Sequence, residues 1–124
     1  MITALETPRH MEVAAEIQRQ ILAHGITYSG SWDMHQLVGC AAPDHRGALR
    51  FLVDGRRFTG KVEVALMASD TYRLRLYRQT SDVIEPFVLE DELEDVYADD
   101  LVEILDRRIE SGRADAVSWT ELAR

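Results

Sequence analysis

The segment Tyr72-Arg-Leu-Arg-Leu-Tyr-Arg78 decides the fold of this 124-residue chain. Its side chains alternate between two faces with a period of two, which is the spacing of a β-strand. The two faces are Tyr72, Leu74 and Leu76 on one side and Arg73, Arg75 and Tyr77 on the other. A strand with one apolar and one polar face is typical of an antiparallel sheet that is covered on one side only.

The same alternation extends to both sides of this segment, so we expect a β region from Ala48 to Leu89. One strand is predicted around Leu49–Val53, a two-residue hairpin turn at Asp54-Gly55, and a second strand over Phe58–Leu66. A last strand is predicted over Val83–Leu89, where Pro86 requires a sheet edge or a bulge. Residues 26–47 are rich in turn formers and predict one or two short, irregular strands.

Amphipathic helices are predicted at both ends of the chain. The first runs from about Pro8 to His24, and the second begins between Asp91 and Ala98 and ends at Ser111-Gly112. The sequence therefore predicts a single α+β domain over residues 1–124: an antiparallel meander of four to five strands with both helices on one sheet face. Residues 1–7 and 113–124 are candidate flexible ends.

Composition and charge limit the classes of function. The chain has 14 Lys and Arg against 22 Asp and Glu, which gives a net charge of -8 and disfavours nonspecific binding to nucleic acid or anionic lipid. Its single cysteine, Cys40, cannot form an intramolecular disulfide. We find no signal peptide and no apolar run long enough to span a membrane, so a cytoplasmic protein is expected.

The charges are strongly segregated along the chain. Residues 79–106 contain eleven acids and no Lys or Arg, whereas residues 46–78 contain eight bases and three acids. The acids suit a solvated helix start. They also suit a face that imitates a phosphate backbone and binds a cationic nucleic-acid-binding surface on another protein. The residues of this predicted acidic face are Glu90, Glu92, Glu94, Asp95, Asp99, Asp100 and Glu103.

Two alternatives use the basic strands instead. Arg50, Arg73, Arg75 and Tyr77 form a face that could hold single-stranded nucleic acid by phosphate contacts and stacking. The same arginines could instead meet the acidic helix of a second copy and form a homodimer. The overall negative charge argues against the first of these two alternatives.

Catalytic and metal-binding motifs are nearly absent from the sequence. There is no Gly-rich phosphate loop, no paired CxxC, no HExxH and no Gly-x-Ser-x-Gly. His35, Cys40, Asp44 and His45 lie close together in sequence but lack the spacing of a structural zinc site. We therefore predict no enzyme activity, no metal and no cofactor, and we assign Trp32, Met34 and Leu37 to the core.

Several segments together resemble a family of small proteins carried by bacteriophages and mobile elements. They are Ile17-Gln-Arg-Gln-Ile-Leu22, Trp32 to Gly39, Leu49-Arg-Phe-Leu52, Val62-Glu-Val-Ala-Leu66, Asp70-Thr-Tyr-Arg-Leu-Arg-Leu76 and Val96-Tyr-Ala-Asp-Asp-Leu101. The resemblance covers about residues 17–112 and carries over no catalytic residue. It implies a setting in which small acidic proteins block host machinery. The leading expectation is thus an interaction protein, such as an anti-CRISPR or another anti-defence inhibitor, with a host protein or ribonucleoprotein complex as its partner.

Overall fold

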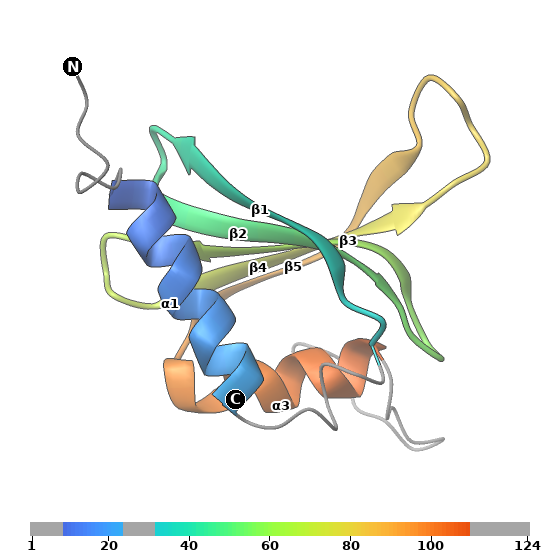
Figure 1. The fold of residues 1–124 in the computed structure, drawn as a ribbon. Helices are drawn as coiled ribbons and strands as arrows, with labels where there is room; N and C mark the ends of the chain where they lie inside the picture. Colours follow the sequence, from blue (N-terminus) through green and yellow to red (C-terminus); the bar gives the residue numbers. More distant parts are fainter. Residues whose placement is uncertain (1–8, 24–31, 110–124) are drawn as a thin grey trace.

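The computed structural model describes residues 9–23 and 32–109, which form two helices and one five-stranded sheet (Figure 1). The helices are α1 (Arg9–Ala23) and α3 (Ala98–Ile109). The strands are β1 (His35–Ala42), β2 (His45–Asp54), β3 (Thr59–Leu66), β4 (Tyr72–Gln79) and β5 (Phe87–Val96). Neighbours along the chain pair antiparallel in the order β1-β2-β3-β4-β5. The predicted α+β meander is confirmed.

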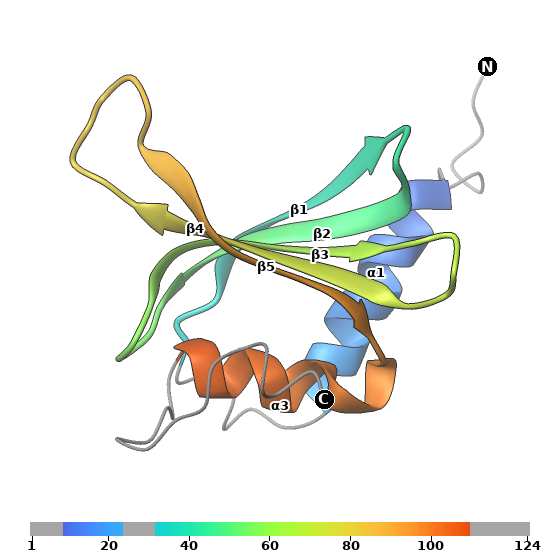
Figure 2. The same ribbon diagram turned by 180° about the vertical axis from the view of Figure 1, so that it is seen from behind.

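Both helices cover the same face of the sheet, as Figures 1 and 2 show from opposite sides. The apolar face predicted for β4 supplies Leu74 and Leu76 to the core, and β3 supplies Val62 and Val64. From the helices, buried side chains at three- and four-residue steps complete the core: Val13, Ala14, Ile17 and Ile21 of α1 and Leu101, Ile104, Leu105 and Ile109 of α3. The core is therefore one layer between sheet and helices.

The helix ends predicted at Pro8, His24 and Ser111-Gly112 lie outside the described residues, as do the candidate flexible ends 1–7 and 113–124. Within the described part, acids and bases match the dipole of α3. Asp99 and Asp100 occupy its first turn and Arg107 and Arg108 its last. These positions place negative charge at the amino end and positive charge at the carboxyl end, which stabilises the helix.

The β2–β3 connection differs from the predicted two-residue turn. Asp54 pairs with Thr59, so four residues, 55–58, form the loop. The amide nitrogens of Arg57 and Phe58 donate to the carbonyl of Ile109, at 2.9 and 3.3 Å. The longer loop thus satisfies a carbonyl at the end of α3, a long-range role that the local Asp-Gly signal does not reveal.

The most important correction concerns the acidic run. The predicted strand Val83–Leu89 in fact begins at Phe87, after Pro86, and continues through the acids to Val96. Residues 91–96 are therefore strand, and the helix starts at Ala98, the last position of the predicted window. The spacing of Leu93, Val96 and Tyr97 resembles a helix, but residues 91–96 pair with β4, and Leu93 and Val96 pack against the core from there. Tertiary contacts therefore override the local pattern.

The predicted core assignment of the segment before β2 is correct in part. Trp32 is fully buried, and its indole nitrogen donates to Asp106 Oδ1 at 2.8 Å. Met34 packs against the core from a partly buried position. The assignment of Leu37 is wrong, because Leu37 lies exposed on the edge strand β1, where no strand covers its outer side.

Candidate functional site

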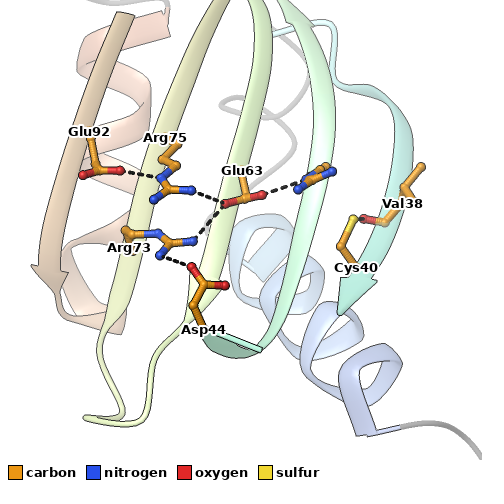
Figure 3. A network of polar contacts seen from close by, with 8 residues as sticks. Val38, Cys40, Asp44, Glu63, Arg73, Arg75 and Glu92 are labelled. Carbon is orange, nitrogen blue, oxygen red and sulfur yellow. Dashed lines mark hydrogen bonds and ion pairs between the residues drawn. The ribbon is translucent and has the colours of Figure 1, made fainter. Parts of the chain in front are cut away.

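A network of charged side chains lies on the sheet face that carries no helix (Figure 3). Glu63, on the central strand β3, is almost fully buried there. Its carboxylate accepts from Arg50 Nε at 2.7 Å and from Arg73 Nη2 at 3.3 Å. Arg73 Nη1 also donates to Asp44 Oδ2 at 2.8 Å, in the β1–β2 turn. One carboxylate therefore joins arginines from both neighbouring strands.

The pKa shifts follow from these contacts. Burial by itself raises the pKa of Glu63, but hydrogen bonds and positive charge from Arg50 and Arg73 outweigh it and leave that pKa below its ordinary value. The hydrogen bond from Arg73 likewise lowers the pKa of Asp44. In return, the hydrogen bond to Glu63 raises the pKa of Arg50. The network is ionised and internally neutralised.

The acidic strand β5 lies directly beside the basic strand β4. Arg75 is paired in register with Glu92, and the two side chains form an ion pair. Arg78 and Arg108 both form ion pairs with Glu90. The hydrogen bond from Arg78 holds the pKa of Glu90 below its ordinary value. The sequence-level division into an acidic half and a basic sheet is therefore wrong, because the last sheet strand is itself acidic and its charges are matched by arginines.

The seven residues of the predicted acidic face consequently separate into two groups. Glu90, Glu92 and Glu103 are each ion-paired, the last with Arg107 at 3.0 Å. The other four are exposed and form no ion pair with any residue in the described ranges: Glu94, Asp95, Asp99 and Asp100. They flank Tyr97, which is also exposed.

We call Glu94, Asp95, Tyr97, Asp99 and Asp100 the acidic corner. It is formed where β5 ends and α3 begins, with the buried side chain of Val96 fixing the chain to the core between them. Asp95 adopts a left-handed backbone conformation, with φ of 58°, and turns the chain out of the strand. The corner combines unpaired carboxylates with an exposed aromatic ring, which can stack on a cation.

The residues of the alternative basic face come together as predicted, but they are not free. Arg50, Arg73 and Arg75 are all ion-paired with acids of the same molecule. The ring of Tyr77 has Lys61 Nζ over it, 4.7 Å from the ring centroid. A phosphate or base on this face would have to displace these partners.

The four residues considered as a zinc site, His35, Cys40, Asp44 and His45, have separate surroundings. Asp44 binds Arg73, His35 Nδ1 lies 2.6 Å from the carbonyl of Asp33, and Cys40 Sγ lies 3.8 Å from the carbonyl of Val38. His45 Nδ1 is buried and has no hydrogen-bond partner in the described part of the chain. No group of three or more His, Cys, Asp or Glu within residues 9–23 and 32–109 is placed to hold a metal ion.

Two features were missed by sequence analysis. Glu63 is the centre of the polar network, and its position between two arginine-bearing strands was the available signal. The second is a projecting loop between β4 and β5 that carries Val83 and Ile84, an apolar pair set between Asp82 and Glu85.

Comparison of the chain with protein-family models, with curated proteins and with solved structures gives no match. The resemblance to mobile-element proteins therefore stays a hypothesis. Neither α1 nor α3 is long and apolar enough to cross a membrane, and these are the helices of the described residues.

Proposed function

We propose that the chain is a small interaction protein that binds a cationic surface of another protein through its acidic corner. The observation that carries this proposal is the cluster of four exposed carboxylates without ion pairs in the described structure, set around exposed Tyr97. Exposed Tyr within a charged rim is typical of residues that dominate protein interfaces. The net charge of -8 adds long-range attraction toward a basic partner.

The partner we propose is a host nucleic-acid-binding complex, and the role is that of an anti-CRISPR or other anti-defence inhibitor. Support comes from the density of negative charge, which suits a groove that normally holds phosphates. The resemblance to small proteins of bacteriophages and mobile elements supplies the biological setting. Glu90, Glu92 and Glu103 are left out of this proposed contact surface because arginines already neutralise them.

A tagged pull-down from bacterial lysate tests the proposal. The wild type is compared with a four-acid variant, Glu94→Gln/Asp95→Asn/Asp99→Asn/Asp100→Asn. A matched control removes the same charge from four other exposed acids that form no ion pair in the described ranges: Glu12→Gln/Asp33→Asn/Asp82→Asn/Glu85→Gln. Each sample is run with and without nuclease and eluted in salt steps, and circular dichroism checks that both variants fold.

We expect a nuclease-resistant, salt-sensitive nucleic-acid-processing complex that the control retains and the four-acid variant loses by about tenfold or more. Equal capture by the four-acid variant would contradict the proposal. Capture that disappears with nuclease would favour the basic face of Arg50, Arg73, Arg75 and Tyr77 instead.

A further inference from the structure

The two edge strands of the sheet, β1 and β5, differ in charge. β5 carries five acids from Glu90 to Asp95, and charges of this kind keep an open strand from pairing with another chain. By contrast, the ten residues from Met34 to Pro43, which include β1, contain no Asp, Glu, Lys or Arg. No strand within residues 9–23 and 32–109 pairs with the outer side of β1. β1 is therefore an open edge without protecting charges.

One part of β1 is regular enough to pair with a further strand. Between His35 and Val38, β1 has two residues against one of β2, and Gln36 in this bulge has a φ of 53°. Between Cys40 and Ala42 the extra residue lies on β2 instead, so β1 itself stays extended there. The segment available for pairing is therefore Val38–Ala42, and its midpoint is Cys40.

The surface around this segment is apolar on both faces of the sheet. Val38 lies beside Arg50 on the face without helices and is 55% exposed (Figure 3). On the other face, Met11 of α1 lies against Gly39 and is 41% exposed. The neighbouring acid Glu12 lines the pocket that α1 forms with β3 and β4, not with β1. We call the surface made by β1 and Met11 the β1 side.

The β1 side is large enough for a dimer interface. At ~3.3 Å per residue the uncharged segment is about 30 Å long, and the sheet with its helix layer is roughly 20 Å deep. One molecule can thus bury up to about 600 Å², and two molecules up to about 1,200 Å² in total, which is the lower end for specific interfaces. Absence of charged residues is typical of the centre of such an interface.

We propose that two copies of the chain associate through β1, each β1 pairing antiparallel with that of the other copy across a two-fold axis. The occupant must offer an open, uncharged strand edge, and a second copy offers one. Because the chain carries a net charge of -8, copies repel each other over much of their surface, but apposed β1 sides set no like charges against each other. This dimer uses neither the acidic corner nor the arginines of the sheet, so it stands or falls independently of the proposed function.

Two-fold symmetry limits the register of the proposed pairing. Residues opposite each other in an antiparallel pair point to the same face, so a residue on the axis lies opposite its own copy. With the axis at Cys40, Val38 lies opposite Ala42 of the second copy. The two Cys40 Cα atoms are then about 4.5–5.5 Å apart, within the range that a disulfide spans. The single cysteine of the chain is therefore a direct probe of this pairing.

Sedimentation of the full chain from about 10 µM to about 1 mM tests the association. The mean mass of the wild type should rise to twice the monomer mass and no further, because a two-fold contact closes. Val38→Lys/Ala42→Lys sets lysines opposite each other and should weaken dimerisation by about tenfold or more. The control Val88→Lys/Leu89→Lys adds the same charge to exposed positions of the other edge strand and should dimerise like the wild type.

Oxidative cross-linking tests the register. Diamide takes two electrons and two protons from two thiols, which join as a disulfide, and is itself reduced to the hydrazine. At about 1 mM the wild type should form a covalent dimer about tenfold faster than Cys40→Ser/Leu89→Cys, whose single cysteine lies on the other edge strand. Circular dichroism checks that all variants fold.

A wild type that stays monomeric at about 1 mM would overturn the proposal and leave the β1 edge to a strand of another protein. Growth beyond the dimer, or equal loss of association in both lysine variants, would also overturn it. Equal cross-linking rates for cysteines on the two edge strands would overturn the pairing centred on Cys40.

Discussion

Arg73 Nη2 lies 3.3 Å from Glu63 Oε1, and both side chains are almost completely buried on the sheet face that carries no helix. The register of β3 and β4 sets Arg75 opposite Glu63, so Arg73 reaches the carboxylate from the next position along the same face. Asp44, on the β1–β2 turn, binds the other end of the same guanidinium. On this face, ion pairs thus link β2, β3, β4 and the β1–β2 turn, although the buried Nε of Arg73 has no hydrogen-bond partner in the described part of the chain.

Glu63→Gln should destabilise the protein by about 3 kcal/mol, near the lower end for breaking a buried ion pair, because Asp44 still partly neutralises Arg73. The free energy of unfolding from urea denaturation measures this effect. Glu94→Gln, an exposed acid without a described ion pair, should change stability by less than about 0.5 kcal/mol. A Glu63→Gln protein as stable as the Glu94→Gln control would show that the network contributes little.

Stability should fall in acid, starting below about pH 5. The pKa values of Glu63, Glu90 and Asp44 are lowered in the folded state. A lowered folded pKa means that the unfolded chain binds protons first, so these groups stabilise the fold above their unfolded pKa and the contribution is lost as pH falls through the folded pKa. Urea midpoints between pH 7 and pH 3 should show this decline, with a shallower slope for Glu63→Gln. An equal slope in that variant would argue against Glu63 as a major contributor.

Asp106→Ala should cost about 1–3 kcal/mol because it leaves the buried indole N–H of Trp32 without its acceptor. Asp106→Asn should reduce the free energy of unfolding much less, since an amide oxygen can accept the same hydrogen bond. Chemical denaturation of the two variants separates the lost hydrogen bond from the lost charge. If asparagine and alanine were equally destabilising, the charge of Asp106 rather than its acceptor role would be responsible.

Replacing Gly60 with alanine should destabilise the protein more than replacing Gly39 with alanine. A Cβ on Gly60 would meet the backbone carbonyl oxygen of Tyr77 at 2.1 Å, whereas a Cβ on Gly39 would first meet the thioether sulfur of Met11 at 2.5 Å. The strand backbone cannot move away as a methionine side chain can, so Gly60→Ala should cost about 3 kcal/mol and Gly39→Ala about 1 kcal/mol. Thermal denaturation of both variants checks the order, and the reverse order would contradict this packing argument.

The sequence by itself determined the fold class and much of the core. The alternation in β4, the apolar face of β3 and the three- and four-residue spacing in α1 and α3 are local patterns, and local patterns report which side of an element is buried. These patterns were sufficient to predict an α+β meander with both helices on one face of the sheet.

Only the tertiary structure determined which charged side chains are ion-paired and which are exposed without a partner. Residues 91–96 are helix-like in local spacing, yet they form strand because they pair with β4, where Leu93 and Val96 pack against the core. This pairing neutralises Glu90 and Glu92, an ion pair with Arg107 within α3 neutralises Glu103, and the other four of the seven predicted acidic residues are open. Cross-strand neighbours depend on register between segments distant in sequence, and no local period encodes that register. The exposed tip at Val83 and Ile84 became visible for the same reason, since exposure is set by what the rest of the chain leaves uncovered.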